Sequence, residues 1–153
     1  MFSLLKNFNS KLVQQIHSVN GKKRTKKNSR YKKDVRVSLP HILTLVYLKV
    51  TYNSSLSAIL RSAVQQLLRS DKKVISEFKK NANSYDKAFP PANKARSRVS
   101  VIFEKKDMEK LAVFVKQTHF SYSKIIRVAL TLYLSTKYKD MFDHYTQIAS
   151  TLE

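Results

Sequence analysis

The stretch Arg98-Val99-Ser100-Val101-Ile102-Phe103 decides the fold of this chain. Its apolar side chains at 99, 101 and 103 alternate with Arg98, Ser100 and Ile102, and this period of two is typical of a β-strand buried on one face. A shorter stretch with the same pattern, Arg36-Val37-Ser38-Leu39, lies earlier in the chain. Each stretch is followed by two segments with helical periodicity. Since a lone strand leaves both edges unpaired, we expect the two strands to pair antiparallel.

The two strands begin two copies of one strand-helix-helix unit, at residues 35–70 and 96–136. Their second helices match most clearly, because Ser55-Leu-Ser-Ala-Ile-Leu-Arg-Ser-Ala-Val recurs sixty-six residues later as Ser121-Tyr-Ser-Lys-Ile-Ile-Arg-Val-Ala-Leu. A duplicated unit explains this match better than chance. We take Leu39 and Phe103 as the last inward residues of the two strands. The spacing from Leu39 to Ser55 is then sixteen residues, and the spacing from Phe103 to Ser121 is eighteen. We therefore expect a two-residue deletion in the first unit.

The rest of the chain divides into four segments. Residues 1–20 and residues 137–153 each carry an apolar stripe at steps of three and four, which predicts two terminal amphipathic helices. Residues 21–34 are rich in Lys and Arg without an apolar pattern and predict a flexible basic arm. Residues 71–95 predict a Lys-rich linker that holds at most a short turn or an extension of the preceding helix. The expected fold class is mainly α with one two-stranded antiparallel ribbon.

The charge balance indicates a polyanionic partner. Thirty Lys and Arg against ten Asp and Glu give a formal net charge of +20 over 153 residues, which is more than solubility requires. Nucleic acid is the first candidate, and an anionic membrane surface is the second. The 42% of apolar residues can fill a core. The sequence lacks a run of about eighteen apolar residues, so it predicts no membrane span.

Catalysis and metal binding have little support in the sequence. The chain has no cysteine, and its four histidines lie in four different segments without the spacing of a metal site. Gly21 is the only glycine, which excludes glycine-rich phosphate-binding loops. We expect no enzymatic activity, no metal and no cofactor.

The outward face of the predicted ribbon suits double-stranded DNA. A two-stranded ribbon fits the major groove, where arginine binds guanine, serine reaches several base edges and isoleucine touches a thymine methyl group. Asp34 shares this face and would be repelled by phosphate. The candidate base-contacting residues are Arg36, Ser38, Arg98, Ser100 and Ile102.

Phosphate contacts are expected on both sides of the ribbon. A helix N-terminus presents unpaired backbone N–H groups to an anion, so the serines that begin the second helices can hold phosphate, act as N-caps, or do both. Cations beside the strands would add to this. The candidate phosphate-binding residues are Ser55, Ser57, Ser121, Ser123, Lys124, Lys32, Lys33 and Arg96.

This order of a strand with outward polar residues, a helix, capping serines and a second helix resembles the ribbon-helix-helix family of Arc, MetJ and CopG. The resemblance implies base contacts from the outward strand residues and phosphate contacts from the helix starts. Family members are usually dimers of one unit, so two units in one chain imply an intramolecular pseudo-dimer that binds a non-palindromic site. This arrangement is similar to TraY-type relaxosome accessory proteins, which implies a bacterial cytoplasmic protein on plasmid or nucleoid DNA, with a relaxase or another DNA-processing protein as partner.

Other functions stay open at this stage. A transcriptional regulator would share every residue named so far. From another class, an adaptor could dock on a membrane or a protein through its terminal helices, which could also mediate self-association on DNA. A transit peptide is a rival interpretation of residues 1–20, and RNA binding is weaker because the strands lack the exposed aromatic residues that stack on bases.

Overall fold

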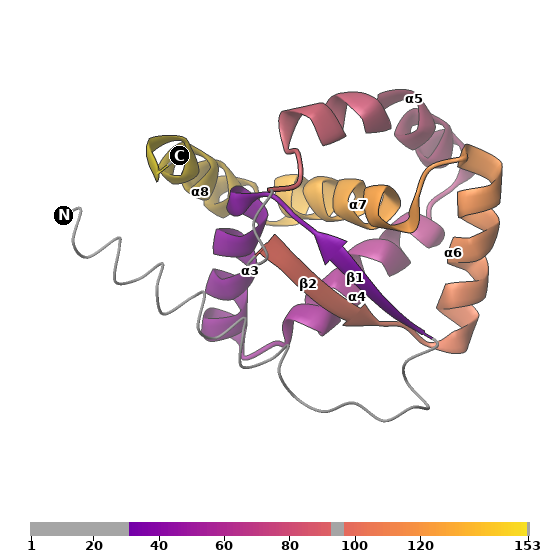
Figure 1. Cartoon of the computed structure of the whole chain (residues 1–153), viewed down its shortest axis with the longest axis horizontal. Coiled ribbons are helices and arrows are strands. Elements are labelled where there is room, and N and C mark those ends of the chain that lie inside the picture. The colour runs from indigo at the N-terminus through magenta and orange to yellow at the C-terminus, as the bar shows by residue number, and fades with distance from the viewer. Residues whose placement is uncertain (1–30, 93–96, 153) are drawn as a thin grey trace.

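The computed structural model describes residues 31–92 and 97–152, and in this part of the chain helices surround one two-stranded ribbon (Figure 1). This confirms the expected mainly helical class with an antiparallel ribbon. The predicted helix over 1–20, and the basic arm up to residue 30, lie outside the described residues. The elements are β1 (Lys32–Arg36), α3 (Leu39–Tyr52), α4 (Leu56–Leu68), α5 (Lys72–Ala88), β2 (Arg98–Ile102), α6 (Lys105–Thr118), α7 (Tyr122–Lys137) and α8 (Lys139–Leu152).

The ribbon covers a core formed by the second helix of each unit. β1 and β2 pair antiparallel, with Asp34 opposite Ser100 at the centre of the register. β1 packs on α7, β2 packs on α4, and α4 and α7 pack on each other (Figure 1). Each strand thus lies on a helix from the other half of the chain. The inward strand residues, all nearly inaccessible to solvent, are Val35, Val37, Val99, Val101 and Phe103.

The two units share their element boundaries. β2, α6 and α7 begin sixty-six residues after β1, α3 and α4, and both strands and both first helices have equal lengths. Val37 is therefore the counterpart of Phe103, and the predicted two-residue deletion is wrong. Leu39 is the first residue of α3, not the last inward residue of the strand. The error arose because Ser38, the N-cap of α3, has an extended backbone that continues the strand alternation by one step.

The turns between the paired helices are also alike. Asn53 and His119 end α3 and α6 in the left-handed region, at φ of 53° and 60°. Two residues later, Ser55 Oγ accepts a hydrogen bond from Ala58 N and Ser121 Oγ accepts one from Lys124 N, each at 3.1 Å. Both serines are N-caps, which the sequence predicted.

Most of the expected linker is helix α5. Asp71 Oδ1 accepts from Val74 N at 2.9 Å and caps this helix. Phe78 and Ala82 are buried, and the Phe78 ring meets the edge of Phe114 at 5.4 Å. The segment forms a long helix of its own instead of the expected short turn or extension of the preceding helix. Lysine is a good helix former, and apolar residues recur through the segment at steps of three and four.

The C-terminal helix α8 packs against α3 and α7. It buries Phe142, Tyr145 and Ala149, and the Tyr145 ring lies 5.9 Å from that of Tyr47. Among the described helices, none combines the length and the hydropathy that crossing a bilayer demands.

A buried histidine joins the start of α3 to α7. His41 Nδ1 accepts from Ser38 N at 3.1 Å and lies 2.8 Å from Ser38 Oγ, while Nε2 lies 2.7 Å from Thr131 Oγ1. Because a backbone N–H can only donate, Nδ1 is unprotonated and Nε2–H donates to Thr131. The ring packs against those of Phe89 and Phe142, 5.8 and 5.7 Å away, which also contact each other at 5.0 Å. His41 is thus held neutral inside the core.

This histidine should make the fold sensitive to acid. Burial, and secondarily the charge of Arg127, lowers the pKa of His41 to about 3. The unfolded chain therefore takes up the proton first, near the ordinary value of 6.5. The contribution to stability is complete above that pH and is lost between 6.5 and about 3, at about 1.4 kcal/mol per pH unit.

We expect urea denaturation between pH 7.5 and pH 4 to show that the unfolding free energy of the wild-type protein falls with decreasing pH. The fall per pH unit should be smaller in His41→Gln. The exposed His144 offers a matched control, since His144→Gln should keep the wild-type dependence. Equal slopes in the wild-type protein and H41Q would contradict the assignment.

Candidate nucleic-acid interface

The outward face of the ribbon consists of three cross-strand pairs. Their order along the ribbon is Arg36 with Arg98, Asp34 with Ser100, and Lys32 with Ile102. Arg36, Arg98 and Asp34 are exposed, Lys32 and Ile102 are half-buried, and Ser100 is 8% exposed. Four of the five predicted base-contacting residues therefore lie together on one face.

Ser38 does not belong to this face. It follows β1 as the N-cap of α3, is 5% exposed, and has its hydroxyl group against His41. The structure therefore does not place Ser38 with the other predicted base-contacting residues. As an N-cap, Ser38 continues the extended backbone of the strand by one residue before the chain turns into α3.

The centre of the ribbon is engaged in an internal hydrogen bond. Ser100 Oγ donates to Asp34 Oδ1, and Lys32 Nζ lies 3.6 Å from the same carboxylate oxygen. Because the serine hydroxyl has only one hydrogen, Ser100 can accept from a base but cannot also donate to one while this bond is intact. At the centre of the ribbon, the charge of Asp34 is therefore balanced by Lys32, and Asp34 also accepts the hydrogen bond from Ser100. The two ends of the ribbon differ from this centre and from each other.

One end of the ribbon is strongly cationic. Arg36 and Arg98 lie opposite each other in the register and line a hollow together with Asp34 and with Ser123 of α7. Like charges directly opposite each other destabilise a sheet. Arg127 also borders the hollow, but it is 7% exposed and serves the fold, since it binds both carboxylate oxygens of Asp86 at 2.6 and 3.1 Å.

The other end of the ribbon is less charged and is tied to α4. Ser57 Oγ accepts from Ile102 N at 3.1 Å, and Arg61 Nη1 donates to Ile102 O at 3.0 Å. Arg127, sixty-six residues after Arg61, donates in the same way to Arg36 O at 3.1 Å. The sequence contained the signal for these two arginines, since both belong to the repeated serine-rich motif, but only the structure shows that they anchor the strands.

The serines at the helix starts have different tasks. The hydroxyl groups of Ser55 and Ser121 cap their helices, and that of Ser57 is held by Ile102 and also accepts from Arg61 at 3.2 Å. Ser123 shows no such bond among the described residues and faces the arginine hollow instead. The backbone N–H groups at the start of α7 therefore lie next to the cationic end of the ribbon.

The lysines predicted to bind phosphate are not equivalent. Lys32 and Lys33 belong to β1 and not to the flexible arm, because the strand begins three residues earlier than expected. Lys33 Nζ lies 4.0 Å from the centre of the Tyr122 ring, and Lys124 Nζ lies 4.2 Å from that of Phe120. Arg96 lies outside the described residues.

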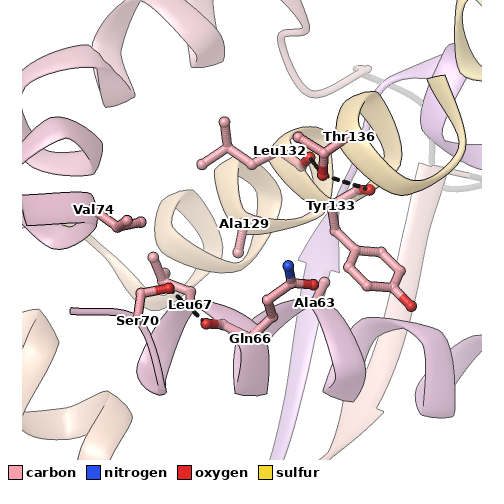
Figure 2. Close-up of a pocket in the computed structure, with 9 residues that line it drawn as sticks. All are labelled: Ala63, Gln66, Leu67, Ser70, Val74, Ala129, Leu132, Tyr133 and Thr136. Atoms are coloured by element: carbon pink, nitrogen blue, oxygen red, sulfur yellow. Dashed lines mark hydrogen bonds between the residues drawn. The ribbon is translucent and has the colours of Figure 1, made fainter.

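A second hollow lies between α4 and α7, on the sides of these helices that point away from Ser57, Arg61 and Arg127. Figure 2 shows its lining, with Ala63 facing Ala129 and only uncharged side chains around the space, whose volume is about 190 Å³. The described residues also hold no cluster of His, Asp and Glu suited to a metal ion. The ribbon face is therefore the stronger candidate for recognition of an anion.

Ser57 and Ser123 occupy equivalent positions in α4 and α7, but among the described residues only the Ser57 hydroxyl group binds the strand backbone. Ser57→Ala leaves the Ile102 N–H without its acceptor, so we expect a loss of about 1–2 kcal/mol of unfolding free energy. Ser123→Ala should change stability by less than about 0.5 kcal/mol. Urea denaturation of both variants tests this, and an equal effect would contradict the separate roles.

Comparison of the chain with protein-family models, with curated proteins and with solved structures finds no match. Nothing is therefore transferred from a relative, and the function is argued from the charge and geometry of the ribbon face.

Proposed function

We propose that this protein binds double-stranded DNA in a sequence-specific manner by inserting its two-stranded ribbon into the major groove. The observation that carries the proposal is the facing pair of Arg36 and Arg98 on the exposed side of the ribbon. Two arginines opposite each other place two positive charges at one end of the ribbon, which attracts an anionic ligand, and arginine binds guanine O6 and N7 bidentately. The net charge of +20 favours the same ligand.

The proposal includes a tandem ribbon-helix-helix architecture in which two units form an intramolecular pseudo-dimer. The shared offset of sixty-six residues supports it, and so does the pair of equivalent bonds from Arg61 to Ile102 and from Arg127 to Arg36. Each bond ties one unit's strand to the other unit's second helix, as in an intertwined pair.

Phosphate groups on the two sides of the groove would lie against the N-termini of α4 and α7. Ser55 and Ser121 cap these helices with their hydroxyl groups, which leaves other backbone N–H groups of the first turn for an anion. Ser123 and Lys124 add a hydroxyl group and a cation on the α7 side. The two sides therefore differ in their capacity for phosphate.

The biological role we propose is that of an accessory factor in plasmid or conjugative DNA processing, acting in the bacterial cytoplasm beside a relaxase. The alternative is a transcriptional regulator with the same interface. Footprinting on the DNA that surrounds the protein's own gene separates them, because a site beside a transfer origin supports the first role and a site in a promoter supports the second.

We expect Arg36→Ala and Arg98→Ala each to weaken binding to a selected duplex by about 1–3 kcal/mol. Arg36→Ala should not lower the unfolding free energy by more than about 0.5 kcal/mol, since it removes a like charge opposite Arg98. Arg69→Ala, at the exposed C-terminus of α4, is the matched control. Equal losses for a selected and a random duplex would rule out base contacts by these arginines.

The register also predicts a DNA site whose two halves differ in sequence, because both arginines lie at one end of the ribbon and Ile102 lies at the other. Selection from a random duplex library should give guanines in one half of the site and a thymine in the other. Arg98→Ala should relax base preference only in the first half, and Ile102→Ala only in the second. Relaxation of the same positions by both variants would contradict this polarity.

A further inference from the structure

Helix α5 presents an exposed cationic face. Its buried side is formed by Phe78 and Ala82, and the lysines recur mainly at helical spacing on the opposite side. Glu77 is also exposed and shares part of this face, since it lies four residues after Lys73 and three before Lys80. The exposed lysines of α5 are Lys72, Lys73, Lys79, Lys80 and Lys87.

The C-terminal half of α5 adjoins the arginine end of the ribbon. Asn83 Oδ1 accepts from Lys124 Nζ at the start of α7, and Asp86 holds Arg127, which in turn donates to Arg36 O. Pro91, just after α5, lines the same hollow as the two ribbon arginines. Figure 1 shows this end of α5 nearer the viewer, on the ribbon side, while its N-terminal end recedes.

The other helix that follows a strand-helix-helix unit has no such face. α8 carries one lysine, Lys139, against Asp140 and Asp143, and Lys139 is paired with Asp143 at 2.6 Å. It packs on both α3 and α7, whereas α5 packs mainly on α7. Of the two helices that follow the strand-helix-helix units, α5 therefore carries the greater positive charge.

We propose that Lys79, Lys80 and Lys87 of α5 form an auxiliary phosphate-binding surface for the DNA backbone beyond the arginine end of the ribbon. This inference rests on the proposed DNA binding and extends it, because it makes the footprint longer on one side of the site. The surface continues the cationic region of Arg36, Arg98 and Lys124, so one duplex that follows the ribbon can contact both.

The test uses the full chain and duplexes selected from a random library by the wild-type protein. We expect the triple variant Lys79→Gln, Lys80→Gln, Lys87→Gln to flatten the slope of log K against log salt by about 2 to 3, since each phosphate contact contributes about 0.9. Glutamine is a good helix former, so α5 should persist. The control variant, Lys110→Gln, Lys116→Gln, Lys139→Gln, removes three exposed lysines elsewhere and should change the slope by less than about 1.

Two shortened duplexes test which flank of the DNA site contacts α5. Removing the flank next to the guanine half should weaken wild-type binding about tenfold, and removing the opposite flank should not. The triple α5 variant should lose the response to the first truncation. If the wild-type protein binds no duplex, the proposed function fails. If it binds duplex but responds equally to both truncations, or if the two triple variants behave alike, DNA binding stands and the α5 surface is overturned.

Discussion

The mutual pairing of two five-residue strands is the constraint on which the rest of the structure depends. The two strands pair with each other, Ser57, Arg61 and Arg127 bind further backbone groups of the strands, and the ribbon needs an apolar floor to be stable. That floor is the α4–α7 pair, one helix from each half of the chain. Because β1 lies on α7 and β2 lies on α4, neither half forms the core alone.

Polar groups beneath the ribbon divide the side chains into those that hold the fold and those left for a ligand. Arg61, Arg127 and Ser57 bind strand backbone, and His41 and Ser38 satisfy each other in the core. A buried donor or acceptor without a partner is costly, so these groups are committed to the fold. Arg36 and Arg98, in contrast, place positive charge on the exposed side of the ribbon, where it attracts anions.

The two halves of the chain share a backbone plan but not a surface. The counterpart of Arg36 is Ile102, and the counterpart of Arg98 is Lys32, so equivalent positions at the two ends carry different chemistry. α5 and α8 increase the contrast, since one is basic on its exposed side and the other is not. The two ends of the ribbon therefore differ in charge although the elements around them have equivalent boundaries.

The sequence by itself determined the elements that depend on local chemistry. Alternation at 98–103 predicted β2, serines at 55 and 121 predicted the caps, and the recurring motif predicted equivalent second helices. It misplaced Ser38 and Leu39, because an N-cap continues the extended backbone of a strand, and it missed α5, because lysine content was weighed above helical spacing. Only the tertiary structure decided the register that sets Arg36 against Arg98, and the position of α5 beside the arginine end. Both depend on contacts between residues more than forty positions apart, which no local pattern encodes.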